Sequence, residues 1–280
     1  MPEEKYSRTN RLIKYTDEQK ENLISGIFQG SISTYNLPEE LYKATADYLK
    51  KGLYKGWGKT MAEIKFGTPD LALVKQLREN IYIFSAAKTH SQVREMTDAI
   101  IKDDKVVPFA EFRKSADEIF QRYNEDWLRA EYNTAVGMAR NAEAWQTFES
   151  EKEQFPMLKY NAVNDGNICE ICEPLDGITL PVDDSFWDEF MPENHFNCRC
   201  LVEQYPAEEE RTKETKVASA INETKPLMTE TFMMNPGKDK VIFKEQGAGQ
   251  HPYFSVVDKG FHTQIQRNFG LEIPQTDIDE

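Results

Sequence analysis

Apolar residues recur every three or four positions through residues 16–149, which is the spacing of helices that bury one face. A capping box formed by Thr16 and Gln19 predicts the start of the first helix. Pro38 favours the start of a second helix, because the fixed φ angle of proline suits the first helical turn. Three glycines indicate where this second helix ends: Gly52, Gly56 and Gly58.

Two separate helices are predicted between residues 68 and 104. Thr68 before Pro69 is a helix start signal, and apolar residues continue at helical spacing to Ile81. A second apolar stripe, from Val93 to Ile100, predicts another helix, and the charged run 102–104 closes it.

The longest helical pattern runs from Ala116 to Glu149, after a start signal at Pro108. Its apolar face is broad and rich in aromatic residues, which is typical of a central helix contacted from several sides. Aromatic stripes at this spacing belong to cores far more often than to cofactor sites, so no site is predicted here. Residues 16–149 therefore predict a helical body of about five or six helices.

The pattern changes from helical to β after Pro156. Short strands are predicted at residues 157–163, 178–180 and 201–205, with turn signals between them. A three-stranded sheet of this size has little core of its own, so it needs a further source of stability.

The two ends of the chain and the stretch after the sheet are more polar. The predicted organisation is an N-terminal arm (1–15), a helical body (16–149), a β subdomain (150–205), a charged linker (206–240) and a small C-terminal segment (241–280).

All four cysteines of the chain lie close together in the sequence. Cys169 and Cys172 form a Cys-x-x-Cys pair, which brings two thiolates within reach of one cation. His195, Cys198 and Cys200 follow as a His-x-x-Cys-x-Cys group with three more ligands. Zinc takes about four nitrogen or sulfur ligands in a tetrahedron. The spacing predicts one structural zinc ion, with His195 and Cys198 favoured to complete the first pair, and it leaves open which four of the five residues bind.

This zinc site completes the predicted fold class, which is α+β. A mainly α-helical body precedes a small β subdomain that zinc clips together, and an extended C-terminal tail follows. A metal that ties the two cysteine groups together would supply the stability that the small sheet lacks.

Three other interpretations of the cysteines stay open. Two disulfides would need an oxidising compartment, and the polar residues 1–5 do not predict a secretory signal. A redox pair at Cys169 and Cys172 would be expected within a βαβ pattern, which the surrounding sequence lacks. The thiols could also be buried without a function.

The formal net charge of −14 argues against a general grip on nucleic acids, which requires clustered lysine and arginine. The loop between the two cysteine groups is acidic and has no basic residue, so it would repel phosphates. A local basic patch elsewhere stays open. No apolar run approaches the ~20 residues of a membrane helix, so no membrane partner is predicted.

Catalytic zinc is a further interpretation, because such a site needs a carboxylate near an open metal position. Glu170, Glu173 and Glu193 are near enough in sequence to be considered. However, the order of the ligands differs from the zinc deaminase signature, and no His-Glu-x-x-His motif is present. A nuclease centre would be built from His251, His262 and Lys244, although lone histidines are usually just polar residues.

Five segments form a characteristic pattern: Trp127–Ala135, Asp165–Cys172, Leu175–Gly177, Asp183–Trp187 and Pro192–Cys200. Their order and spacing resemble the phage Mu protein F-like minor head proteins, also called head-morphogenesis proteins. The resemblance covers residues 115–205. The chain departs from the pattern at Met191-Pro192, where family members often have two prolines.

This resemblance implies a head component of a tailed phage or prophage. Such proteins lie near the portal vertex in few copies and act in head assembly, DNA packaging or ejection. The implied partners are the portal protein, the major capsid protein or both, with possible contact to packaged DNA. The implied location is the virion, with the host cytoplasm during assembly. The family is not known for catalysis, so no enzyme is predicted, although some members carry a toxin domain after the motif.

Overall fold

The computed structural model describes residues 12–59, 61–64, 67–163, 166 and 169–257. The fold is mixed and 57% helical, with two small sheets in the described part, which confirms a mainly helical α+β protein. The helices are α1 (Asp17–Phe28), α2 (Glu39–Trp57), η1 (Met61–Glu63), α3 (Pro69–Asp98), α4 (Phe109–Gln121), η2 (Arg122–Trp127), α5 (Leu128–Glu151), η3 (Glu173–Leu175), α6 (Phe186–Glu189), α7 (Glu214–Thr224), η4 (Glu230–Phe232), α8 (Pro236–Asp239) and α9 (Pro252–Ser255). The strands are β1 (Ile101–Lys102), β2 (Lys105–Val106), β3 (Met157–Asn161), β4 (Thr179–Pro181) and β5 (Leu201–Tyr205).

Helix α1 starts where the capping box predicts. The Thr16 hydroxyl accepts a hydrogen bond from the Gln19 N–H over 3.1 Å, and the Gln19 side chain accepts one from the Thr16 N–H over 2.7 Å. The predicted N-terminal arm does not extend to residue 15, since Ile13 and Tyr15 are buried and Tyr15 stacks on Phe120. Residues 1–11 lie outside the described part of the chain.

Helix α2 runs through two of the three glycines that were expected to end it. It ends at Trp57, where Gly58 adopts the left-handed conformation with φ of 76°. Gly52 and Gly56 instead lie against α5, and a Cβ atom on Gly56 would come within 2.0 Å of the Val136 carbonyl oxygen. The glycines are therefore needed for close approach of two helices.

Helix α3 is one continuous helix, which corrects the prediction of two. Nearly all residues of its middle part, between Leu77 and Val93, are buried on every side. A helix that is enclosed all round has no polar face, so its periodicity disappears from the sequence.

The charged run after α3 forms a β-hairpin and does not close a helix. Strands β1 and β2 pair in antiparallel fashion, with Ile101 opposite Val106. Asp103 and Asp104 form the turn with φ of 51° and 58°, as a two-residue hairpin turn requires.

The predicted long helix is confirmed in outline, but it contains a π-helical turn. η2 connects α4 to α5, and the wider turn shifts the phase of the apolar stripe. Trp127, which belongs to the predicted stripe, is therefore 41% exposed, whereas Trp145 and Phe148 further along are buried.

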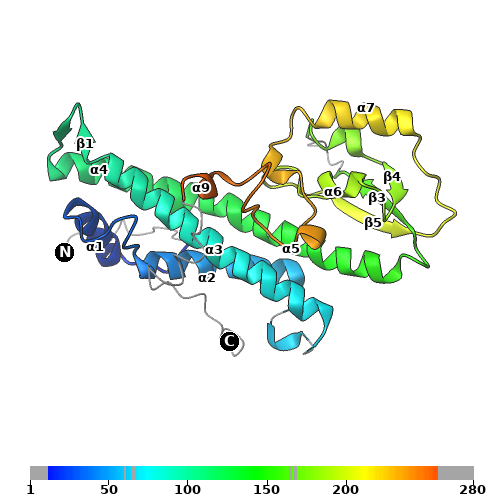
Figure 1. Ribbon diagram of the computed structural model, residues 1–280, viewed down its shortest axis with the longest axis horizontal. Helices are drawn as coiled ribbons and strands as arrows, with labels where there is room; N and C mark the ends of the chain where they lie inside the picture. Colours follow the sequence, from blue (N-terminus) through cyan, green and yellow to red (C-terminus); the bar gives the residue numbers. More distant parts are fainter. Residues whose placement is uncertain (1–11, 60, 65–66, 164–165, 167–168, 258–280) are drawn as a thin grey trace, which may run out of the picture.

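The second sheet has the strand order β4-β3-β5, with both pairs antiparallel. β5 has the predicted bounds, whereas β3 ends at Asn161 and β4 begins at Thr179. Figure 1 shows the sheet between the second half of α5 on one side and α7 on the other. These helices supply the core that three short strands lack.

The stretch 206–240, expected to be a charged linker, contains α7, η4 and α8. Its apolar residues Met228, Phe232 and Met234 are buried, because the chain folds back along α5 and its charges stay on the outer side. Further on, Phe243 stacks on Phe84 of α3 with ring centroids 3.7 Å apart, so the described tail is packed and not extended. The predicted apolar stretch 261–269 and the acidic end lie outside the described residues.

Among the residues that the structure describes, no helix combines the length and apolarity needed to cross a bilayer.

Candidate metal centre

The predicted ligands come from two loops that meet beside the sheet. Cys169 and Cys172 lie in a tight turn before η3, where the Cys172 N–H donates to the Cys169 carbonyl over 3.0 Å. His195, Cys198 and Cys200 lie in the loop before β5, where the Cys198 N–H donates to the His195 carbonyl over 3.2 Å. Pairing of β5 with β3 holds the second loop in place.

The structure brings all five residues into one cluster. Cys169, Cys172 and His195 form one group and Cys172, Cys198 and Cys200 another, each with its ligand atoms within 4.8 Å of one another. The Cys169 sulfur is 3.0 Å from His195 Nε2, and the Cys172 sulfur is 3.8 Å from the Cys198 sulfur. All four cysteines are free thiols, and Cys172 is only 1% exposed. Cys172 therefore connects the two groups.

The thiol geometry suits a tetrahedral cation. Two thiolates on one zinc ion lie about 3.8 Å apart, because each Zn–S bond is about 2.3 Å long. Without a cation the thiols perturb one another: the hydrogen bond with Cys172 lowers the pKa of Cys198 to about 3, and the same contact raises the pKa of Cys172. The cluster thus holds one negative charge, and a bound cation would let more thiols ionise. The cysteine and histidine groups can hold a metal ion.

Neighbouring groups orient these ligands. We assign the His195 Nδ1 proton from its 2.9 Å hydrogen bond to the Phe196 carbonyl, which leaves Nε2 as the coordinating nitrogen. The buried Tyr160 hydroxyl accepts a hydrogen bond from the Asn194 side chain over 3.0 Å and also contacts Cys172. Such supporting hydrogen bonds are typical of metal ligands in proteins.

The three candidate carboxylates have different environments. Glu170 and Glu173 are exposed, whereas Glu193 is buried against Gly137 of α5, 3.8 Å from the Arg140 guanidinium. Burial raises the pKa of Glu193 to about 8, although Arg140 opposes this shift. Glu193 thus holds the ligand loop against α5.

The structure does not assemble the hypothetical nuclease centre. The Lys244 ammonium donates to the Met233 carbonyl over 3.4 Å, while the His251 ring packs on Phe84 and Phe243. His262 lies outside the described residues.

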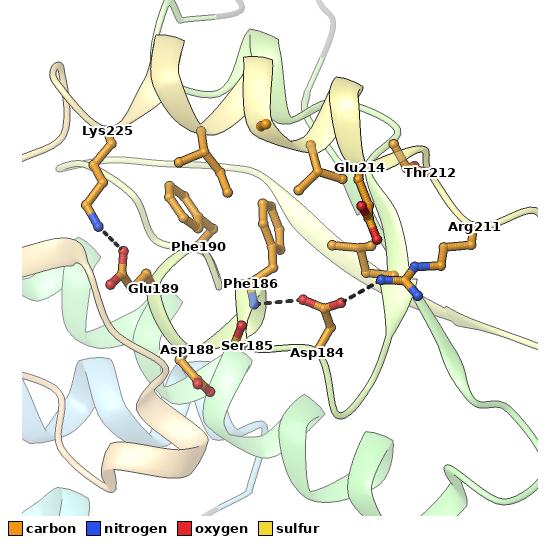
Figure 2. A pocket seen from close by; sticks show the side chains of 14 residues that line it. Asp184, Ser185, Phe186, Asp188, Glu189, Phe190, Arg211, Thr212, Glu214 and Lys225 are labelled. Atoms are coloured by element: carbon orange, nitrogen blue, oxygen red, sulfur yellow. Dashed lines mark hydrogen bonds and ion pairs between the residues drawn. The ribbon is translucent and has the colours of Figure 1, made fainter.

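A cleft of 520 Å³ separates α6 from α7. Figure 2 shows Phe186 and Phe190 on its floor, with an ion pair at each end. Asp184 pairs with Arg211 at 3.4 Å, and Glu189 pairs with Lys225 at 2.5 Å. The charges are therefore already neutralised within the cleft.

A second polar cluster has no counterpart among the sequence predictions. The Lys88 ammonium, buried within α3, lies 2.9 Å from both carboxylate oxygens of Glu131 on α5, and the Tyr253 hydroxyl donates to Glu131 over 2.9 Å. Burial lowers the pKa of Lys88. A lysine inside the apolar run 81–93 was the available signal, because a fully buried lysine needs a charged partner.

Comparison with known families gives one match. The family model described as Phage Mu protein F like protein matches residues 60–203, from η1 through β4 to the end of the second ligand loop and into β5. No curated protein and no solved structure matches the chain.

Proposed function

The chain belongs to the phage Mu protein F-like family, and from this premise we propose that it is a minor head protein of a tailed phage or prophage. Membership of the family points to a phage head morphogenesis protein that interacts with other capsid components. The match over both the long helices and the ligand loops carries the proposal, because it includes the body as well as the motif.

The proposed location is the portal vertex of the virion, in few copies, after assembly in the host cytoplasm. The proposed partners are the portal protein, the major capsid protein or both, and the role is in DNA packaging or ejection. The acidic loop between the two ligand groups suits a basic protein surface better than DNA, since phosphates would be repelled.

The proposed metal is one structural zinc ion. Cys169, Cys172, His195 and Cys198 are the favoured ligands, supported by the contacts of 3.0 Å and 3.8 Å that join them in pairs, with Cys200 beside them. When bound, zinc would tie the turn before η3 to the loop before β5. The three buried cysteines favour a closed structural site, because a catalytic zinc keeps a position open to water. The division of the chain into a body and a zinc-clipped subdomain at residue 150 belongs to this proposal.

The proposed role needs no catalysis. The alternative is a zinc enzyme or a nuclease or toxin effector carried in the head. It predicts an activity that Glu193→Gln abolishes while the metal content stays unchanged. An activity with that behaviour would contradict the assembly role.

Particle composition tests the proposal. We expect the chain to co-purify with the portal protein and to be detected in virions by mass spectrometry. Heads made without it should package DNA poorly. Cys172→Ser should reproduce the defect, and Glu170→Gln on the same exposed turn should not. Normal particles in the absence of the chain, or its absence from particles, would refute the head role.

A further inference from the structure

A cavity of 460 Å³ lies beside the metal centre, between the start of α5, the second ligand loop, η4 and α9. Its walls are almost wholly apolar, and the size is within the range of about 300–1,000 Å³ typical of ligand pockets. The lining residues include Trp127, Ala130, Phe196, Phe232 and Pro252.

Two exposed aromatic side chains flank this cavity. Trp127 is 41% exposed and Phe196 is 45% exposed, although both are large apolar residues. Phe196 packs edge-on against Phe232 with ring centroids 4.8 Å apart, and the Arg122 guanidinium lies 5.2 Å from the Trp127 ring. These contacts hold the rings in place without burying them. Exposed apolar rings around a pocket are typical of protein interaction sites.

His251 supplies a hydrogen-bond donor to the cavity. The residue lines the cavity and is only 7% exposed, packed on Phe84 and Phe243. Its Nδ1 accepts from the Tyr253 N–H over 3.4 Å. Burial and the nearby Lys88 lower its pKa to about 3, so the ring is neutral and the proton resides on Nε2. Nε2 has no hydrogen-bond partner among the described residues.

Glu131 supplies an acceptor from the α5 side. It also lines the cavity and is buried. Its Oε1 accepts from Lys88 and Tyr253. Its Oε2 lies 2.9 Å from Lys88 but makes no hydrogen bond. A buried polar atom without a hydrogen bond costs free energy, so a ligand that satisfies both groups would bind more tightly than an apolar one.

We propose that this cavity binds a tyrosine side chain of a partner protein. The apolar walls take the ring, and the phenol hydroxyl can both accept from His251 and donate to Glu131. Phenylalanine would leave the two polar groups unsatisfied, and a carboxylate would be repelled by Glu131. The exposed rings of Trp127 and Phe196 favour a protein over a free molecule, because they offer apolar contact around the anchor. The partner rests on the proposed head role, whereas the binding of the side chain does not.

Indole NMR signals of the full chain test the proposal. Trp127 is exposed, whereas Trp57, Trp145 and Trp187 are buried, so its signal reports on the cavity. Titration with N-acetyl-tyrosinamide should shift this signal to saturation with a Kd of about 1 mM. N-acetyl-phenylalaninamide should bind at least about fivefold more weakly. p-Cresol should bind no more tightly than the tyrosine amide, since the amide carries the peptide groups of a protein.

Two variants provide controls. Ala130→Phe fills the cavity and should abolish binding, while Ala218→Phe in the cleft below α7 should leave it unchanged. His251→Phe keeps the aromatic packing and should bring the two amides to equal affinity, which tests the idea even where Ala130→Phe disturbs folding.

Three results would overturn the proposal: no saturable shift of the Trp127 signal, equal binding of both amides by the native chain, or binding of p-cresol with exclusion of the tyrosine amide. A chain that enters particles normally but shows any of these results refutes the cavity assignment alone and leaves the head role intact.

Discussion

The contact between α2 and α5 makes Gly56→Ala a sharp test of the fold. A Cβ atom at this position would lie 2.0 Å from the Val136 carbonyl oxygen and 2.9 Å from the Ala139 Cβ atom. Two of the three nearest atoms belong to the α5 backbone and cannot rotate away. The helices must therefore separate, over the most extensive helix contact of the body.

Two opposing effects set the size of the change. Alanine has a higher helix propensity than glycine by about 1 kcal/mol, which favours the variant. Overpacking a close contact costs about 1–3 kcal/mol, and a backbone clash this severe is expected at or above the upper end. The net destabilisation should be about 2 kcal/mol.

Gly52→Ala is the matched control, on the same face of the same helix. Its Cβ atom would lie 3.0 Å from the Tyr132 carbonyl oxygen and 3.2 Å from the Ala135 Cβ atom, which small adjustments can accommodate. The propensity gain is the same in both variants. The stability difference between Gly56→Ala and Gly52→Ala therefore isolates the steric term.

Denaturant and thermal unfolding followed by far-UV circular dichroism measure this difference. One kcal/mol corresponds to a shift in melting temperature of about 2–4 °C in a domain of roughly this size. The Gly56→Ala variant should therefore melt about 4–8 °C below the native chain, and Gly52→Ala within about 3 °C of it. Equal stability of the two variants would refute the close approach of α2 and α5.

Three further predictions concern the metal and the buried charges. Protein made with zinc should contain about one zinc per chain by elemental analysis, and Cys172→Ser should retain less than about half of it; a native content near zero would contradict the site. Burial keeps His251 neutral in the folded chain, so its contribution to stability is complete above the unfolded pKa of about 6.5 and is lost as the pH falls towards 3. The native chain should therefore lose about 2 kcal/mol between pH 7.5 and 5 relative to His251→Phe in denaturant unfolding, and parallel pH profiles would exclude this. Glu131→Gln should cost about 3–5 kcal/mol because it leaves Lys88 without its counter-ion, and adding Lys88→Met should recover at least about half of the loss; simply additive losses would show that the two residues are not coupled.

The sequence alone identified the features that depend on local chemistry. The capping box at Thr16 places the start of α1 because its hydrogen bonds join residues three positions apart. The bounds of β5 follow from a short apolar run directly after Cys200. The spacing of the cysteines and His195 was enough to place five ligands in one cluster and to indicate the family.

Tertiary contacts decided the features that the sequence misplaced or missed. Gly56 has the same local signature as a helix end, and only the approach of α5 explains why the helix continues through it. The middle of α3 lost its periodicity because neighbours enclose it on all sides. Lys88 and Glu131 are 43 positions apart, and only their burial in one core makes them partners. Local hydrogen bonds can be recognised along a chain, whereas close approach and charge pairing arise only when distant segments are packed together.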